Sequence, residues 1–300
     1  MKYALFFVLM FLTVYPQERD TLRQGIGFPI SDIKWGRLAL SGSVLVGADI
    51  GVWFYAKQAW YTYGTVKWHT FNDWYNAKLN LDKLGHAHLT MMYNKMLYHT
   101  GIWCNFSESE ANWSAAAISW IMQCQIELYD AYFENWGFSW PDLAGNTVGA
   151  FFPTLQREYP FLQNFNLKYS YHPSSDLENR FINDFLNDYE GTTYWLTVNV
   201  NELLPKSIGE YYPDWLDIAI GYGVNQVFLP DGSWNHDVKN NKRGLGNQEW
   251  YIALDYDLLR LFNPQKGTFW YSALDLLNLI HLPSPAIRIS PSAIYYGIYF

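Results

Sequence analysis

The chain has few charged residues for its length. Only 16% of its 300 residues are Asp, Glu, Lys or Arg, against about 25% in soluble globular domains. The formal net charge of −8 excludes the basic stripe that nucleic-acid binding needs. With 50% hydrophobic residues, the composition also excludes a disordered chain. We therefore expect a folded protein that has no nucleic-acid partner.

The chain also lacks the short motifs of the common enzyme classes. It contains no Gly-x-Ser-x-Gly, no P-loop and no Gly-x-Gly-x-x-Gly. Its two cysteines, Cys104 and Cys124, do not have the spacing of a zinc site. They are either two small buried side chains or, in an oxidising compartment, a disulfide. These motifs predict no cofactor. A divalent metal ion is considered below as one interpretation of a cluster of polar residues.

The first residues predict export from the cytoplasm. Lys2 and an apolar run over residues 4–14 precede a polar segment, which is the pattern of a secretory signal peptide. The run is too short to span a bilayer, which takes about 20 residues. Aromatic residues make up 19% of the chain, and their amphipathic rings favour membrane interfaces. We predict a signal peptide over residues 1–17 and a periplasmic or outer-membrane-associated protein of the cell envelope.

The hydrophobic pattern changes near residue 165. Before it, the spacing of apolar residues is helical, and after it short alternating runs lie between turns rich in Pro, Gly and Asn. The pattern predicts an α+β fold, with a bundle of about four helices followed by a mainly β C-terminal region. The predicted parts are a helical bundle domain over 30–165 and a connector with a β-rich region over 166–300. The predicted helices cover 38–57, 82–100, 112–134, 141–156 and 269–282, and the predicted strands cover 193–201, 215–224, 250–258 and 293–300.

The segment 38–56 is the most apolar of the predicted helices. Its 19 residues contain one charge, Asp49. Ser43, Gly47 and Gly51 lie one turn apart, so they form a small-residue face that would let another helix approach closely. The segment is either a membrane span or a buried helix of the bundle.

Three pairs of polar residues interrupt the other predicted helices. The two members of each pair are three or four positions apart, so they share one helix face. An unpaired buried charge is costly, and the pairs can offset this cost by meeting inside the bundle. The pairs are Asp82 with His86, Glu127 with Asp130, and Asp142 with Asn146.

This predicted polar cluster has three interpretations. It is a hydrogen-bonded network that fixes the register of the helices, or a site in which Glu127, Asp130 and Asp142 hold a hard divalent cation. In the third interpretation, His86 beside a carboxylate acts as a general base or binds a ligand. The residues alone leave these interpretations open.

The order and spacing of the polar residues resemble a known family. The chain contains Asp82-Lys83-x-x-His86, then Glu127-x-x-Asp130, and then Gly137-Phe138-Ser139-Trp140-x-Asp142-Leu143-x-x-Asn146-x-x-Gly149-Ala150. These elements are similar to those of the YfiM-type predicted periplasmic lipoproteins, a family of unknown function. The long C-terminal region resembles an extended Bacteroidota form of that family. VanZ-like membrane proteins are more remotely similar, because comparable polar residues interrupt a small helical bundle in them.

The resemblance implies a place in the cell envelope and no particular activity. The chain departs from the family by lacking the cysteine that would carry a lipid anchor. We therefore predict a non-enzymatic envelope protein, acting as a scaffold or accessory subunit of a membrane complex, with membrane lipid and envelope proteins as partners. The alternative is a metal-assisted envelope hydrolase of lipid or glycan, with its site centred on His86 and Glu127.

Overall fold

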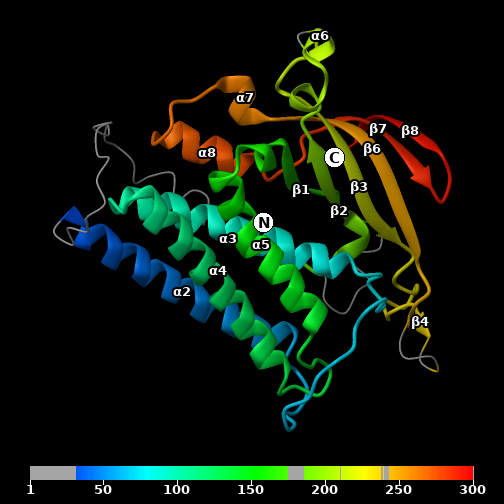
Figure 1. The fold of residues 1–300 in the computed structure, drawn as a ribbon. Helices are drawn as coiled ribbons and strands as arrows, with labels where there is room; N and C mark the ends of the chain where they lie inside the picture. The colour runs from blue at the N-terminus through cyan, green and yellow to red at the C-terminus, as the bar shows by residue number, and fades with distance from the viewer. Residues whose placement is uncertain (1–31, 175–185, 210, 238, 240–242, 300) are drawn as a thin grey trace.

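The chain folds into a helical N-terminal part and a C-terminal part built on a sheet (Figure 1). The structure is a computed structural model that describes residues 32–174, 186–209, 211–237, 239 and 243–299. The predicted signal peptide, residues 1–17, lies outside the described residues. The fold class is α+β, as predicted, because four helices precede a mostly antiparallel β region.

Four long helices form the N-terminal part. Each bound lies within four residues of the predicted one. Ser107 and Glu110 form a capping box at the start of α4, and the Ser139 side chain caps α5 with a proline in its first turn. The helices are α2 (Trp35–Ala59), α3 (Leu81–Trp103), α4 (Glu108–Asp130) and α5 (Trp140–Glu158).

The C-terminal part contains a six-stranded sheet in the order β1-β2-β3-β6-β7-β8, and every neighbouring pair in it is antiparallel. The short helices α6 (Lys206–Gly209), α7 (Leu258–Phe262) and α8 (Phe269–Leu277) lie between strands. The short pair β4 (His236–Asp237) and β5 (Arg243–Gly244) forms a separate ladder. The six strands are β1 (Phe165–Tyr171), β2 (Thr192–Val198), β3 (Leu216–Asn225), β6 (Asn247–Tyr256), β7 (Ser284–Ser290) and β8 (Ile294–Tyr299).

Two strands of the six-stranded sheet, β1 and β7, were not predicted from the sequence, and neither was the short pair β4 and β5. The segment expected to be a connector begins with β1, whose buried side chains are the polar Asn166, Lys168 and Ser170. Apolar and polar residues alternate in β1 as in other strands, but its apolar side chains are the less buried ones. The prediction that the last helix extends to residue 282 was also wrong, since α8 ends at Leu277. Strand β7 then contains Pro285 at a register shift, where a missing N–H breaks no regular ladder bond.

Small residues on α5 allow α3 to approach closely. A Cβ atom added to Gly149 would lie 2.1 Å from the carbonyl oxygen of Ala87, and one added to Gly145 would lie 2.6 Å from that of Lys83. On α2, by contrast, a Cβ added to Gly47 or Gly51 would meet no atom of the described chain within 4 Å. The predicted small-residue contact therefore exists on α5 and is not made by α2.

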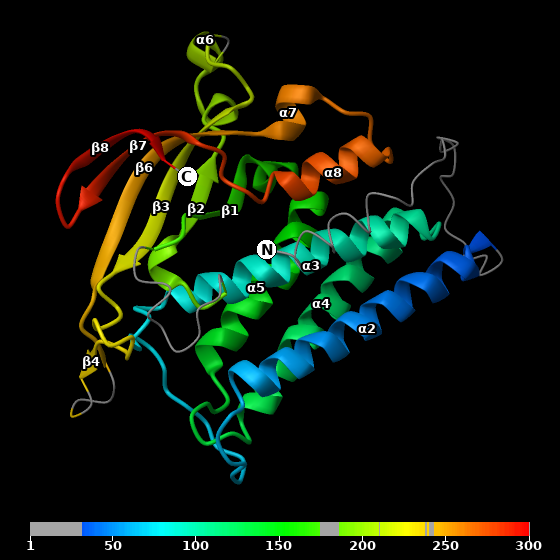
Figure 2. The same ribbon diagram turned by 180° about the vertical axis from the view of Figure 1, so that it is seen from behind.

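Helix α2 lies along the outside of the bundle, beside α4 and away from the sheet (Figures 1 and 2). Of the two alternatives for this segment, a buried helix of the bundle does not fit, because Ala56 is the only residue of α2 that is buried. Among the described residues, α2 is the one helix long and apolar enough to cross a membrane. Both cysteines are free, with Cys104 buried and Cys124 half-buried, so they do not form the disulfide that was one alternative.

The sheet exposes apolar side chains and buries polar ones. Alternate residues of β6, such as Trp250, Ile252 and Leu254, are exposed. The residues that alternate with them, Glu249, Tyr251, Ala253 and Asp255, are buried, so two carboxylates lie on the buried face beside a small hydrophobic cluster. A sheet with one face in water normally shows the opposite pattern, with its apolar face towards the core. The exposed face of this sheet therefore lacks the polar side chains that a face in contact with water normally carries.

Candidate functional site

The predicted polar residues meet where the N-terminal ends of α3 and α5 face the C-terminal end of α4. His86 lies at the centre. Its Nδ1 atom is 3.1 Å from Oδ1 of Asn146 and 3.6 Å from Oε1 of Glu127, and its Nε2 atom is 3.8 Å from Oδ1 of Asp142. Four of the six predicted residues thus form one group, which we call the His86 cluster: His86, Glu127, Asp142 and Asn146.

Two carboxylate oxygens of the cluster, Oε1 of Glu127 and Oδ1 of Asp142, have no hydrogen-bond partner among the described residues. Lys83 Nζ lies 2.8 Å from the Asp142 oxygen, so Oε1 of Glu127 is the one without a lysine beside it. Glu127 is fully buried, and the backbone N–H of Ser139 lies 3.4 Å from its Oε2 atom. A ligand atom from each of His86, Glu127 and Asp142 lies within 4.8 Å of the other two. An imidazole and two carboxylates at this separation are groups that can bind a divalent cation.

Lys83 forms the centre of an adjoining group of ion pairs. Its Nζ atom lies 3.1 Å from Asp82 and 2.8 Å from Asp142, and it also contacts Asp73. Asp82 therefore reaches the His86 cluster through Lys83, and it also lies 3.3 Å from Lys78. The ammonium group of Lys83 occupies the space among the three aspartates, so these three do not form a second metal site.

The sixth predicted residue, Asp130, lies beside the cluster and binds a different partner. The hydroxyl of Tyr61 donates a 2.5 Å hydrogen bond to its Oδ1 atom. Tyr61 comes from the loop between α2 and α3, and its ring stacks on Phe133 at a centroid distance of 4.1 Å. Asp130 is thus held at the end of α4 by Tyr61. The cation interpretation placed it beside Glu127 and Asp142 around one ion, and it does not belong to that group.

Asp73 was missed by the sequence analysis although it is part of the site. It is buried in the loop before α3, where the Ser139 hydroxyl donates a 2.8 Å hydrogen bond to it. The loop has no regular period, so the pattern of apolar residues gives no sign that this residue faces inward. The one sequence signal for it is Lys83, a charged residue on an otherwise apolar helix, which indicates that a carboxylate lies nearby.

The site holds more carboxyl groups than cations. Five carboxyl groups, those of Asp73, Asp82, Glu127, Asp130 and Asp142, lie around Lys78, Lys83 and His86. If all were ionised, the site would stay negative even with His86 protonated. Burial of a net charge is unfavourable, so the fold must hold either protons or a cation there.

Burial and the excess of carboxyl groups shift the pKa values of the site upward. Burial raises the pKa of Glu127 to about 8, with Asp142 adding to the shift and His86 opposing it. Burial also raises the pKa of Asp130 to about 6, against the hydrogen bond from Tyr61. Burial alone would lower the pKa of His86, but the carboxylates of Asp142 and Glu127 raise it. The cluster is therefore suited to hold protons near neutral pH.

A second buried network lies at the other end of α3, where it contacts α8. Nε2 of His99 is 2.8 Å from Oδ2 of Asp275, and the Lys95 ammonium donates a 2.6 Å hydrogen bond to Oδ1 of the same carboxylate. The Ser272 hydroxyl lies 3.1 Å from Nδ1 of His99. The sequence analysis found no partner for His99, because Asp275 is 176 residues away.

Comparison with known proteins relates the bundle to an envelope family. The model of a family described as predicted periplasmic lipoprotein (DUF2279) matches residues 71–158. The match includes all six predicted site residues and the newly found Asp73, and it leaves α2 and the sheet outside. No curated protein matches the chain. No solved structure matches it either.

The family description agrees with the predicted location in the cell envelope, periplasmic or associated with the outer membrane. It gives the matched domain no activity. The family match says nothing about an extended Bacteroidota form or about VanZ-like proteins, so both stay resemblances.

Proposed function

We propose that the protein is a non-enzymatic component of the cell envelope that is anchored in a membrane by α2 and serves as a scaffold or accessory subunit of a membrane complex. The observation that carries the proposal is the exposure of α2. Its 25 residues contain an 18-residue apolar window of which no residue is buried. An unburied apolar helix of this length is stable when hydrocarbon covers it.

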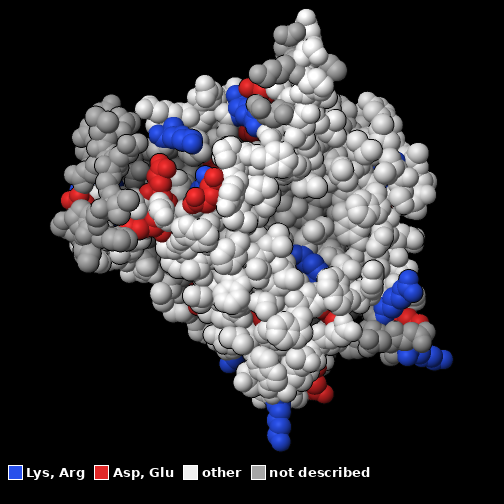
Figure 3. Space-filling view, viewed as in Figure 1, with Lys and Arg blue, Asp and Glu red and all other residues white. Residues whose placement is uncertain are grey.

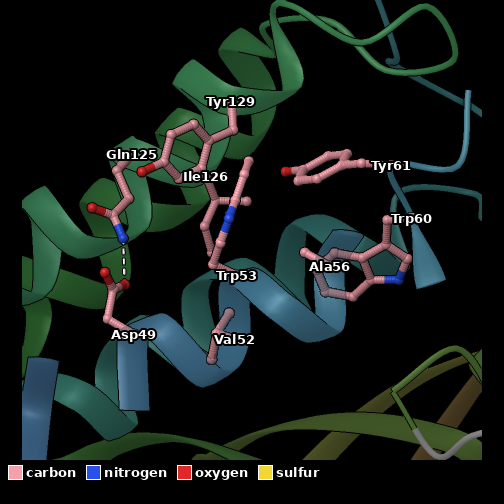
Figure 4. A pocket seen from close by; sticks show the side chains of 9 residues that line it. All are labelled: Asp49, Val52, Trp53, Ala56, Trp60, Tyr61, Gln125, Ile126 and Tyr129. Atoms are coloured by element: carbon pink, nitrogen blue, oxygen red, sulfur yellow. Dashed lines mark hydrogen bonds between the residues drawn. The ribbon is translucent and has the colours of Figure 1, made fainter. Parts of the chain in front are cut away.

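The contacts of α2 with the rest of the protein use one narrow face. Gln125 donates a hydrogen bond to Asp49, and the rings of Trp53 and Tyr129 lie 4.7 Å apart (Figure 4). Val46 and Phe54 on the same helix are each 59% exposed. Such an arrangement supports a helix that attaches the bundle to a membrane while most of its circumference stays free for lipid.

A further feature supports a scaffold. The His86 cluster joins α3, α4 and α5 through buried side chains that contact one another. A shared polar network of this kind fixes the register of the helices.

Extraction of membranes tests the anchor. The full chain is produced in cells and the membranes are washed with alkaline carbonate, which releases peripheral proteins. We expect the wild type and a Val46→Leu/Ile50→Leu control to stay with the membrane. A Val46→Asp/Ile50→Asp variant should be released, because two carboxylates oppose insertion of α2. Release of the wild type, or full retention of the aspartate variant, would contradict the anchor.

A second candidate function is a metal-assisted hydrolase of lipid or glycan. The observation that favours it is the buried, undonated Oε1 atom of Glu127 within reach of His86 and Asp142. In this proposal the three residues would hold a divalent cation that activates water for attack on an ester or glycosidic bond.

Thermal melting separates the two candidates. Under the scaffold proposal, a chelator leaves the melting temperature of the wild type unchanged. Under the hydrolase proposal, the chelator lowers that temperature, and the Glu127→Ala variant is insensitive to it because the site has lost a ligand.

A further inference from the structure

The sheet carries an unbroken row of apolar side chains across five strands. The row consists of Leu196, Ile220, Ile252, Ile287 and Tyr295, each paired in register with the next. Each of these residues is at least 45% exposed. At about 4.8 Å between strands, the row is about 19 Å wide.

The row lies on the outer face of the sheet, which we define as the face that carries Ile220. The segment just before α3 covers one end of this face, where the Tyr222 hydroxyl donates a 2.6 Å hydrogen bond to the carbonyl of Leu79. The rest of the face is open among the described residues. In the space-filling view, charged side chains gather at the left and lower right, and the area over β6 to β8 is almost free of them (Figure 3).

The polar groups of the strands are on the opposite, inner face. There, Nζ of Lys168 lies 3.3 Å from Asp255 and donates a hydrogen bond to the carbonyl of Tyr256. His281 lies 3.3 Å from the same carboxylate and stacks on Trp195. The strands have therefore turned their charges inward and their aliphatic side chains outward.

We propose that the outer face of the sheet lies against the acyl chains of a lipid bilayer. Alternation with apolar residues outward and polar residues inward is the pattern of strands that face hydrocarbon in membrane barrels. Soluble monomers rarely expose an apolar patch larger than a few hundred Å². On the central strands, the exposed apolar side chains of this face are Ile218 and Ile220 of β3 and Trp250, Ile252 and Leu254 of β6.

Lipid fits this face better than a protein partner does. The aliphatic members of the row offer no hydrogen-bonding side chain, and a protein interface usually surrounds its apolar centre with polar contacts. The inference deepens the membrane association proposed above and rests on it, but it concerns a surface that α2 does not share.

Site-specific labelling in vesicles tests the inference. In the full chain, Cys104 and Cys124 are replaced by alanine and an environment-sensitive fluorophore is attached to the Ile252→Cys variant. A second variant, Ile50→Cys, reports on α2, and Asp231→Cys in an exposed turn serves as the control. Each protein is reconstituted in phosphatidylcholine vesicles with and without brominated acyl chains, which quench a fluorophore that touches them.

We expect the label at position 252 to be quenched several-fold more than the label at position 231. Quenching at 252 but not at 50 would keep the sheet against lipid and remove the α2 anchor. Quenching at 50 but not at 252 would overturn the present inference and keep the anchor. A blue-shifted but unquenched label at 252 would also overturn it, because the face would then be covered by protein, such as a second copy of the chain.

Discussion

The helical bundle and the sheet both bury charged side chains, but they balance them differently. In the sheet, Asp255 lies between Lys168 and His281, and Glu249 pairs with Arg288. Each of these two carboxylates has a cation beside it. Asp217, which is buried on the same face, instead accepts a hydrogen bond from the Asn199 amide, and burial raises its pKa to about 6. In the bundle, five carboxyl groups share two lysines and a histidine.

This difference separates structural charges from charges that can have a function. In a balanced buried pair, each charge is neutralised by its partner, so no further proton or ion is needed. Such a pair adds little to stability. An excess of carboxyl groups must be met by protons or by a cation, so it responds to pH and to metal ions. The bundle is therefore the region whose stability is expected to depend on pH, and the sheet is the region for which we propose contact with the membrane.

The largest expected effect is that of Lys83→Met. The variant leaves the carboxyl groups of Asp73, Asp82 and Asp142 without their shared cation. Uncompensated buried charge of this kind costs about 3–5 kcal/mol. Chemical denaturation in detergent should show this loss in the free energy of unfolding, and Lys67→Met, at an exposed position, should be unchanged. Equal stability of the two variants would mean that the bundle has no excess of charge.

The next largest effect is on the pH dependence of stability. Because the pKa of Glu127 is raised to about 8, the folded state binds a proton that the unfolded state has lost above its ordinary pKa of about 4.3. Stability should therefore fall as pH rises from about 4.3 to 8, by at most about 1.4 kcal/mol per pH unit. The Glu127→Gln variant should give a flatter profile over this window. An identical slope in both proteins would show that Glu127 is ionised in the fold.

A smaller effect is expected where α5 touches α3. The Gly149→Ala variant places a Cβ atom 2.1 Å from the carbonyl oxygen of Ala87, and the resulting overpacking should cost about 1–3 kcal/mol. Thermal melts would record this loss as a lower melting temperature. A melting temperature like that of the wild type would show that the two helices are not in close contact.

The smallest effect is expected on α2. An added Cβ at Gly47 meets nothing within 4 Å, so Gly47→Ala should be neutral or stabilise the helix by up to about 1 kcal/mol through helix propensity. The same melting series measures it beside Gly149→Ala. Clear destabilisation would place another helix against this face of α2.

The helices and most of the site were predictable because their signals are local. The pairs of polar residues on single helix faces, such as Asp82 with His86, placed the site at the right ends of the helices. At the start of α5, the local signals are Ser139 at the N-cap and Pro141 in the first turn. The roles of these residues and the division into domains near residue 165 stay predictions.

The parts that could not be predicted depend on contacts that no local pattern records. In strand β1 the alternation of apolar and polar residues was present in the sequence, but burial of its polar side chains was not predictable, because it depends on partners such as Asp255 and Asn278 far along the chain. Asp73 lies in an irregular loop, and its part in the site depends on Lys83 and Ser139 in three dimensions. His99 and Asp275 meet only because α8 packs back onto α3.

The central claim is that the His86 cluster balances its charge with protons in a non-enzymatic, membrane-anchored protein. Metal analysis of the full chain, purified from native membranes without chelators, tests this most directly. The account predicts a metal content far below one ion per chain, with no difference between the wild type and the Glu127→Ala variant. One divalent ion per wild-type chain, absent from the variant, would contradict it and favour the hydrolase.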